Sequence, residues 1–501
     1  MARFLMISGT ASHVGKSVLV AALCRLLVDD GHKVAPFKSQ NMSLNSWVTK
    51  NGDEIGIAQA VQAWAARIQP SVDMNPVLLK PKGDMMSQVI LHGKPLGDRK
   101  VGEYYDSTEA IFQHVCDSLK ALARSYDVIV MEGAGSPAEI NLYKQDIANL
   151  RVARGADAPV VLVGDIERGG VFASLYGTVQ LLAKDDQKRI KGFIINKFRG
   201  DEKLLEPGLT QLEELTGIPV LGVIPYVNVR LPSEDSVSLG DTLPAAHSIL
   251  DIAVIRLPHI SNFTDFEPLE AVARVRYVSL NDNFGEPDAI IIPGTKNTVD
   301  DLRAMRRSGM DKRIEASART IPIIGICGGF QMLGQTITDE GFEGTQNQSN
   351  FVEGLRLLQA WTVFNSSKKT TKQVEKRVTG TGPVFDRLTN QTVLGYEIHM
   401  GSTTCGLPIF DDDGGQDATG LVFGTYLHGL FHNDNFRSAL VEHLHSRRMR
   451  KPHGAHRRAP QGSTGLERQL PSDQDVDPFD ELARVVLEHV DMQALYSIIG
   501  L

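Results

Sequence analysis

One stretch of sequence decides the fold of the first half of the chain, Gly9-Thr10-Ala11-Ser12-His13-Val14-Gly15-Lys16-Ser17. It follows an apolar run at Phe4–Ser8 and opens a segment with helical periodicity at Lys16–Leu27. A glycine-rich turn between a strand and a helix is typical of a phosphate-binding loop, because backbone N–H groups and the helix N-terminus attract anions. The sequence therefore predicts a nucleotide site in which Lys16 reaches the phosphates and Ser17 binds Mg²⁺.

The spacing within this loop departs from the commonest phosphate-binding motif. That motif requires glycine at position 10, where this chain has Thr10, and Gly9 comes one residue too early. The longer pattern Gly-Thr-x-Ser-x-x-Gly-Lys-Ser resembles the loop of the dethiobiotin synthetase group. This resemblance implies that the nucleotide is ATP and that five residues contact it, namely Gly9, Thr10, Gly15, Lys16 and Ser17.

Other residues of the first half support the same resemblance. Lys38 follows the strand-like run Ala35-Pro36-Phe37, and in that group such a lysine helps to neutralise the phosphate and the carboxylate being phosphorylated. Glu132, in Met131-Glu132-Gly133-Ala134-Gly135, stands at the carboxyl end of a strand, where open α/β sheets bind ligands. The resemblance implies Mg²⁺ binding by Glu132 and Glu54 and adenine contact by Asn196. For an acid such as Glu54, a solvated surface position is the alternative.

The chemistry implied by this resemblance is the activation of a carboxylate. A carboxylate resists attack by amines because oxide would have to leave. Transfer of the γ-phosphoryl group of ATP makes an acyl phosphate, from which phosphate leaves instead. Mg²⁺ and lysines stabilise the charge on the transferring group, so catalysis depends mainly on positioning and electrostatics.

A second motif, in the other half of the chain, indicates a nucleophilic cysteine. The stretch Ile323-Ile324-Gly325-Ile326-Cys327-Gly328-Gly329-Phe330-Gln331 places Cys327 between a strand and a helix, with glycines at positions −2 and +2. This pattern describes a nucleophile elbow, in which small neighbours permit a strained turn. The N–H groups of Gly328 and Gly294 are candidates for an oxyanion hole, and His428 is the candidate base. A buried inert thiol and a structural histidine are the alternatives.

This pair of motifs resembles the class I glutamine amidotransferases, in which the cysteine attacks the amide of glutamine and releases ammonia through a glutamyl thioester. The commoner members carry glutamate two residues after the histidine, where this chain has Leu430. The third member of the site is therefore left open. Glu397, in Gly395-Tyr396-Glu397-Ile398-His399, is one candidate for this third member. The alternative is that Glu397 only helps to shape the site.

Apolar runs around the two motifs predict an α/β fold with two doubly wound domains. The resemblances imply that the first is like the P-loop NTPases and the second like the class I glutamine amidotransferases. The runs are continuous rather than alternating, as in parallel strands covered on both faces. They lie at Phe4–Ser8, Lys33–Phe37, Asp127–Met131, Pro159–Val163, Gly192–Asn196, Pro219–Ile224, Ile252–Leu257, Ala289–Ile292, Ile321–Ile326 and Val422–Leu427. We predict a synthetase domain over residues 1–227, a linker over 228–248, an amidotransferase domain over 249–445, a flexible linker over 446–476 and one terminal helix over 477–501.

Length and composition agree with two large soluble domains. The 501 residues include 42% hydrophobic and 22% charged residues, and the formal net charge is −8. A weakly acidic chain lacks the basic field of most nucleic-acid-binding proteins, so no nucleic-acid partner is expected. Four scattered cysteines exclude a disulfide scaffold and indicate a reducing, cytoplasmic compartment. No apolar run approaches the roughly 18 residues of a spanning helix, so neither membrane insertion nor a signal peptide is expected.

An acyl-phosphate site and an ammonia-releasing site on one chain fit a single reaction, the glutamine-dependent amidation of a carboxylate. Together with the stretches 38–43, 54–60, 165–172, 196–201 and 293–298, the two motifs resemble the cobyric acid synthase family over the chain apart from residues 446–475. The resemblance implies ATP-dependent amidation of the b, d, e and g carboxylates of a corrinoid, adenosylcobyrinic acid a,c-diamide. The candidate substrate-side groups are Lys38, Gln40 and Asn41.

Two alternatives stand beside this interpretation. The a,c-diamide-forming synthase has both domain types but acts on other carboxylates. A nucleotide-dependent switch of the partitioning-ATPase kind would carry a degenerate second domain, and the presence of Cys327 and His428 argues against it.

Overall fold

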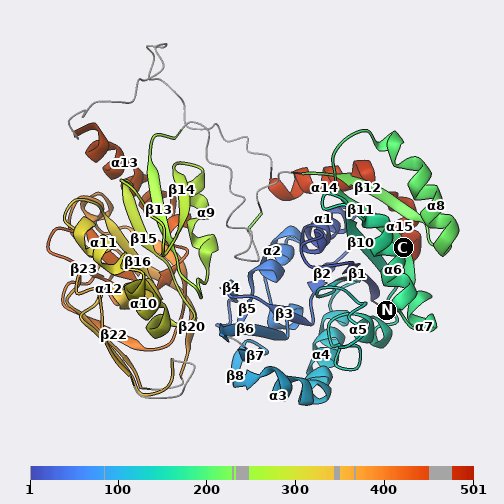
Figure 1. Ribbon diagram of the computed structural model, residues 1–501, viewed down its shortest axis with the longest axis horizontal. Helices are drawn as coiled ribbons and strands as arrows, with labels where there is room; N and C mark the ends of the chain where they lie inside the picture. The colour runs from blue at the N-terminus through green and yellow to red at the C-terminus, as the bar shows by residue number, and fades with distance from the viewer. Residues whose placement is uncertain are drawn as a thin grey trace, which may run out of the picture.

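The computed structural model describes residues 2–83, 85–227, 231–232, 248–343, 350–365, 368–450 and 477–501. Two α/β units lie side by side and contain most of the described residues (Figure 1). The predicted linker at 228–248 lies mostly outside the described residues, as does most of the predicted linker at 446–476. None of the described helices is both long and apolar enough to cross a membrane.

The first unit contains a six-stranded parallel sheet in the order β12-β11-β10-β1-β9-β2. Met6 of β1 packs with the helices on one face, whereas Leu5 and Ile7 pack with those on the other. Because both faces are covered, successive positions are apolar, which confirms the predicted runs. The strands are β1 (Arg3–Gly9), β2 (Val34–Phe37), β9 (Val128–Glu132), β10 (Val160–Asp165), β11 (Ile190–Phe198) and β12 (Val220–Pro225); the helices include α1 (Lys16–Asp29), α4 (Thr108–Ala123), α5 (Leu150–Gly155), α6 (Val171–Leu181) and α8 (Glu206–Thr216).

The second unit contains another six-stranded sheet, in the order β14-β13-β15-β16-β24-β23. Its first five strands are parallel, and β23 pairs antiparallel with β24 at the edge. The strands are β13 (Asp251–Arg256), β14 (Arg274–Ser279), β15 (Ala289–Ile292), β16 (Ile323–Ile326), β23 (Gly415–Gln416) and β24 (Val422–Thr425). The helices include α10 (Thr298–Arg307), α11 (Met310–Ser317), α12 (Gly328–Leu333) and α13 (Asp434–Arg450).

Further strands lie outside the two large sheets, and among them β4 of the first unit contacts β20 and β21 of the second. In the first unit they form a sheet in the order β3-β6-β7-β8 and a hairpin, β4-β5, that leads into α2. Figure 1 shows β4, β5 and β6 on the side of the first unit that faces the second. Their bounds are β3 (Gln40–Met42), β4 (Ser46–Val48), β5 (Glu54–Gly56), α2 (Ile57–Ala65), β6 (Val77–Gly83), β7 (Met86–Leu91) and β8 (Lys94–Lys100). Those of the second unit include β17 (Thr336–Asp339), β18 (Asn350–Glu353), β19 (Ala360–Phe364), β20 (Thr370–Arg377), β21 (Thr392–His399), β22 (Ser402–Cys405) and β25 (Leu427–His428).

The β4–β5 hairpin joins the two units by direct contacts. The amide N–H of Ser46 donates to Oδ1 of Asn262 at 3.2 Å, and the hydroxyl of Tyr396 donates to the carbonyl oxygen of Ser46 at 3.2 Å. The ring of Trp47 meets that of Tyr396 edge-on, with centroids 4.7 Å apart. Because both hydrogen bonds are buried, they fix the orientation of the hairpin against the second unit.

The C-terminal segment packs on the first unit, next to α1 and β12 (Figure 1). It forms two helices, α14 (Pro478–His489) and α15 (Met492–Ile499), where the sequence pattern predicts one. The helix is interrupted at Val490, whose extended backbone pairs with Gly222 of β12. Arg25, almost fully buried on α1, anchors the segment through a 2.6 Å ion pair with Asp477.

The second unit also extends farther than predicted. Helix α13 ends at Arg450, so residues 446–450 are helical and do not belong to a flexible linker. The basic residues here, which the sequence pattern assigns to a linker, have partners in the fold. Arg448 binds the buried Asp288 at 2.7 Å, and Arg447 donates to the carbonyl oxygen of Thr320. Their position in the last turn also complements the helix dipole.

Candidate active site

The glycine-rich loop joins the carboxyl end of β1 to the start of α1. Gly15 has a φ of 100°, and a Cβ atom built on it would lie 2.0 Å from Nδ2 of Asn196, so only glycine fits there. The ammonium group of Lys16 donates to the carbonyl oxygens of Ala11 at 2.8 Å and Gly135 at 3.2 Å. These bonds hold the lysine between the loop and the segment that follows β9.

Glu132 gathers three polar groups around its buried carboxylate. Oγ of Ser17 and Nζ of Lys38 each donate to Oε1 at 2.8 Å, and Nε2 of Gln62 donates to Oε2 at 2.6 Å. Glu132 is only 1% exposed, so these donors compensate for its desolvation. Strands β1, β9 and β2 are neighbours in the sheet, and their carboxyl ends meet at one edge. The predicted groups of the phosphate site are therefore brought together.

The residues around Glu132 fit a nucleotide with Mg²⁺. Oγ of Ser8 and Oδ1 of Asn149 are buried and have no hydrogen-bond partner among the described residues. A Cβ atom on Gly133 would lie 2.9 Å and 2.3 Å from them. Unpaired atoms of this kind mark a place where a polar ligand completes the hydrogen bonding. One carboxylate and the hydroxyl of Ser17 suit Mg²⁺, which proteins usually hold with one or two carboxylates together with phosphates and water.

Three other predicted side chains lie near this cluster. Nδ2 of Asn196 donates to the carbonyl oxygen of Val14 at 2.9 Å, so this side chain supports the phosphate loop, and its contact with adenine stays a prediction. Gln40 and Asn41 lie on β3, directly after Lys38 and Ser39. Gln40 accepts a hydrogen bond from the hydroxyl of Tyr104, and Asn41 donates to Gln59 at 3.0 Å.

Glu54 is not brought to the predicted metal site. Its carboxylate is fully buried and binds the ammonium groups of Lys80, at 2.7 Å, and of Lys369 from the second unit. Burial alone would raise the pKa of Glu54, but the charges of Lys369 and Lys80 hold it well below its usual range. Since each oxygen already binds a cation, the structure replaces the predicted Mg²⁺ contact with an ionic bridge between the two units. The complete burial of Glu54 also excludes the alternative, a solvated surface position.

Cys327 lies at a sharp turn between β16 and α12. Its φ is 51°, in a left-handed region that residues with side chains rarely adopt. The flanking glycines make the turn possible. A Cβ atom on Gly325 would lie 2.6 Å from Cδ1 of Leu333, and one on Gly329 would lie 2.0 Å from the carbonyl oxygen of Ile292. The observed turn has the geometry of a nucleophile elbow.

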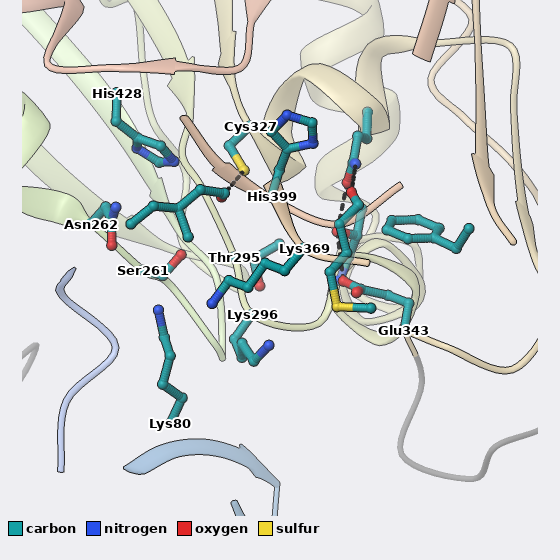
Figure 2. Close-up of a pocket in the computed structure, with 15 residues that line it drawn as sticks. Lys80, Ser261, Asn262, Thr295, Lys296, Cys327, Glu343, Lys369, His399 and His428 are labelled. Carbon is teal, nitrogen blue, oxygen red and sulfur yellow. Dashed lines mark hydrogen bonds between the residues drawn. The ribbon is translucent and has the colours of Figure 1, made fainter. Parts of the chain in front are cut away.

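His428 stands beside Cys327 in the same pocket (Figure 2). Its Nδ1 lies 2.7 Å from Oδ2 of Asp265, and the N–H of Gly429 donates to the other oxygen at 2.9 Å. Burial alone would lower the pKa of His428, but the charge of Asp265 and the contact with Cys327 raise it to about 10. A protonated ring at this place stabilises the thiolate form of Cys327.

The two predicted oxyanion donors lie around the same thiol. A Cβ atom on Gly294 would lie 3.3 Å from Cε1 of His428, and one on Gly328 would lie 2.6 Å from Cγ2 of Thr295. Strands β15 and β16, which lead into these two turns, are adjacent in the sheet. The two backbone segments thus approach each other beside Cys327, as an oxyanion hole requires.

Asp265, and not Glu397, supports the histidine. Glu397 binds Lys376 at 2.6 Å, and hydrogen bonds from His399 and Lys376 outweigh its burial and lower the pKa of Glu397 to about 2. Asp265 comes from a one-turn helix at Phe263–Phe266, far from the histidine in sequence. No spacing rule connects them, so sequence reasoning misses Asp265.

The thiol pocket extends to the first unit. Figure 2 shows Lys80, which belongs to β6, across the pocket from Cys327, with Lys296 and Lys369 between them. Burial lowers the pKa of Lys369 to about 8, and burial together with the charge of Lys369 lowers that of Lys296. The amidotransferase site therefore faces the synthetase unit, which no sequence motif indicates.

Comparison with known proteins places both units in families. A model of the CobQ/CobB/MinD/ParA nucleotide binding domain matches residues 5–238, and a model of the CobB/CobQ-like glutamine amidotransferase domain matches residues 251–436. The chain is 57% identical to a probable cobyric acid synthase from Methanococcoides burtonii, covering 100% of this chain and 97% of that protein. The chain belongs to the cobyric acid synthase family. Similar proteins from Methanosarcina acetivorans and Methanosarcina mazei are 56% and 55% identical, with 99% of each chain covered.

Membership of the cobyric acid synthase family confirms the predicted fold class and the predicted class of enzyme, a glutamine-dependent amidating ligase. The nucleotide-binding match includes the glycine-rich loop and Glu132, and the amidotransferase match includes Cys327, His428 and Asp265. Both domains of the cobyric acid synthase arrangement are thus present in this chain.

We predict that Asp265→Asn lowers the rate at which iodoacetamide alkylates Cys327 at neutral pH by at least about tenfold, the effect of one pKa unit. Without the carboxylate charge the pKa of His428 falls, the ring loses its proton near neutrality, and less thiolate is stabilised. Glutamine hydrolysis should fall by about 10²- to 10⁴-fold, as when a catalytic histidine loses its orienting carboxylate. Mass spectrometry of the Cys327 peptide and glutamate release measure the two effects.

The matched control is Glu397→Gln, which neutralises the other candidate acid. Both rates should stay close to those of the unmodified protein. The reverse pattern, with Glu397→Gln inactive and Asp265→Asn active, would contradict the assignment of Asp265.

Proposed function

We propose that this chain amidates the b, d, e and g carboxylates of adenosylcobyrinic acid a,c-diamide with nitrogen from glutamine, giving adenosylcobyric acid. ATP with Mg²⁺ drives each amidation. The observation that carries the proposal is that one chain holds both a buried phosphate-site cluster at Glu132 and a thiol site at Cys327, His428 and Asp265. Neither site makes an amide alone, whereas together they supply an activated carboxylate and ammonia. The names of the relatives support a corrinoid substrate.

In the synthetase step a carboxylate oxygen of the corrinoid attacks the γ-phosphorus of ATP. The bond to the bridging oxygen breaks, ADP leaves and an acyl phosphate forms. Lys16 and Lys38 place positive charge beside the transferring group, and Mg²⁺, held by Ser17 and Glu132, would neutralise further charge there. Ammonia then attacks the acyl carbon and phosphate leaves. Gln40 and Asn41 are the proposed substrate-side groups, since they follow Lys38 on β3.

In the glutaminase step the sulfur of Cys327 attacks the amide carbon of glutamine. The N–H groups of Gly294 and Gly328 stabilise the oxyanion, and His428 gives a proton to the leaving ammonia. Water then hydrolyses the glutamyl thioester, and glutamate leaves. Asp265 binds Nδ1 of His428, so Nε2 is the nitrogen that exchanges protons.

The proposed reaction predicts a defined product series. Incubation with ATP, Mg²⁺, glutamine and the corrinoid a,c-diamide should give four successive carboxylate-to-amide mass changes. Each change should be accompanied by the release of one glutamate and one phosphate. Mass spectrometry of the corrinoid follows them. If the enzyme amidated cobyrinic acid at two carboxylates but did not amidate the a,c-diamide supplied as substrate, it would be the a,c-diamide-forming synthase. That result would contradict the proposal.

Separate variants should divide the two half-reactions. Cys327→Ser should lose glutamine-dependent amidation but keep amidation supported by ammonium chloride, because the synthetase site is intact. Lys16→Met should lose amidation from either nitrogen source and keep part of its glutamate release. Cys405→Ser, a cysteine of the same unit outside the elbow, is the matched control and should behave like the unmodified protein. Full glutamine-dependent activity in Cys327→Ser would rule out the assigned nucleophile.

A further inference from the structure

Two short segments of the first unit, one after β2 and the other on α2, are connected at both ends by hydrogen bonds. At one end Lys38 and Gln62 donate to the two oxygens of Glu132, at 2.8 Å and 2.6 Å. At the other end, three residues along each segment, Nδ2 of Asn41 donates to Oε1 of Gln59 at 3.0 Å. Gln59 and Gln62 are neighbours on α2, because residues three apart on a helix share one side. The pair formed by Asn41 and Gln59 therefore lies next to the phosphate-site cluster.

The side-chain amide of Gln59 carries a buried donor that the fold does not use. Gln59 is 0% exposed, and its Oε1 atom accepts from Asn41. Its Nε2 atom has no hydrogen-bond partner within the part of the chain that the structure describes. An unpaired buried donor destabilises a protein, so such a group calls for an explanation, and a ligand that supplies the acceptor is one. Neither half-reaction described above uses Gln59.

The second unpaired amide atom on α2 belongs to the metal cluster. Oε1 of Gln62 is also buried and without a partner among the described residues, while its Nε2 donates to Glu132 and to the carbonyl oxygen of Ser17. An acceptor at this place suits the water molecules that Mg²⁺ usually keeps in proteins. The two atoms thus differ in kind, since Gln62 offers an acceptor beside the metal cluster and Gln59 offers a donor one helical turn away.

The neighbours of Gln59 indicate which acceptor it takes. Lys38, at the other end of the connected segments, also presents N–H groups and a positive charge, which favours an anion with more than one oxygen. The phosphates of ATP have the glycine-rich loop and α1 as their proposed site. Gln59 is bonded instead to β3, the strand that carries the proposed substrate-side groups. A carboxylate of the substrate is therefore the acceptor that fits this position.

We propose that Nε2 of Gln59 donates to the carboxylate that is being phosphorylated, and that this donor selects carboxylates over the carboxamides that the reaction makes. The inference rests on the proposed function, because it requires a carboxylate substrate. A carboxylate accepts hydrogen bonds at both oxygens, one from Gln59 and one from Lys38. A carboxamide has a single oxygen, so its NH₂ group faces a donor and one hydrogen bond is lost. Each finished amide is thereby released, and the next carboxylate takes its place.

Steady-state kinetics with ammonium chloride as the nitrogen source test this role without the glutaminase step. Gln59→Met keeps an unbranched side chain of similar length but removes the donor. Its KM for the corrinoid a,c-diamide should rise by at least about tenfold, as expected when a hydrogen bond to a charged group is lost. The KM for ATP and glutamate release from glutamine should stay unchanged. Gln69→Met, the same change at an exposed residue just after α2, is the matched control.

Product inhibition separates recognition from a merely structural role. In the unmodified protein the inhibition constant of adenosylcobyric acid should exceed the KM of the a,c-diamide, and in Gln59→Met this ratio should fall several-fold. A structural defect would raise both constants alike and leave the ratio unchanged, which would overturn the proposal. A raised KM for ATP with an unchanged KM for the corrinoid would also overturn it, because the donor would then serve a phosphate.

A second variant keeps the test decisive if Gln59→Met does not fold. Gln59→Glu preserves the size of the side chain and the acceptor for Asn41, but places a negative charge against the substrate carboxylate. The KM for the corrinoid should again rise at least about tenfold, since like charges repel. An unchanged KM in this variant would contradict the role of Gln59. Failure of the proposed function is a different result, because the unmodified protein would then amidate the corrinoid from neither nitrogen source.

Discussion

The carboxylate of Glu132 is almost completely buried, and the interactions that compensate for its burial organise the synthetase half of the molecule. Removing one partner from a buried ion pair typically costs about 3–5 kcal/mol, so the donors around this acid are tightly constrained. Ser17 comes from α1, Lys38 from the segment after β2 and Gln62 from α2. Glu132 thereby fixes three elements around the phosphate loop. Because α2 begins where the β4–β5 hairpin ends, the same cluster positions the surface on which the second unit docks.

The docked hairpin also reaches the surroundings of the thiol site. Ser46 binds Asn262, which lies three residues before Asp265, and also binds the hydroxyl of Tyr396. The ring of Tyr396 stacks on that of His428, with centroids 5.3 Å apart and planes inclined by 16°. The first unit thus contacts Tyr396, which stacks on the histidine, and Asn262, which immediately precedes the one-turn helix that carries Asp265.

Much of the fold and both catalytic loops could be predicted because their physical causes are local. Parallel strands covered on both faces leave continuous apolar runs, and turns at a phosphate or a nucleophile leave glycines such as Gly15 and Gly325. The strands outside the two large sheets leave no such pattern: β8, for example, is polar and almost wholly exposed. Residues 446–450 look like a linker only because Asp288, the partner of Arg448, is remote in sequence.

Individual site residues were harder to predict where their partner lies on another element. The resemblance implies a metal ligand at Glu54, but a partner of this carboxylate, Lys369, belongs to the other unit. Asp265 carries no motif and meets His428 only after folding. By contrast, Glu132 ends β9, and Ser17 and Lys38 come after β1 and β2. These three strands are neighbours in the sheet, so topology alone brings the residues together.

The central claim is that a corrinoid carboxylate is activated as an acyl phosphate at the Glu132 cluster. Oxygen transfer tests it most directly. The corrinoid a,c-diamide is prepared with ¹⁸O in its free carboxylates and amidated with ATP and glutamine, and the inorganic phosphate is then analysed by mass spectrometry. An acyl phosphate requires one ¹⁸O atom to appear in phosphate for every amide formed. Amide formation with unlabelled phosphate would contradict the claim.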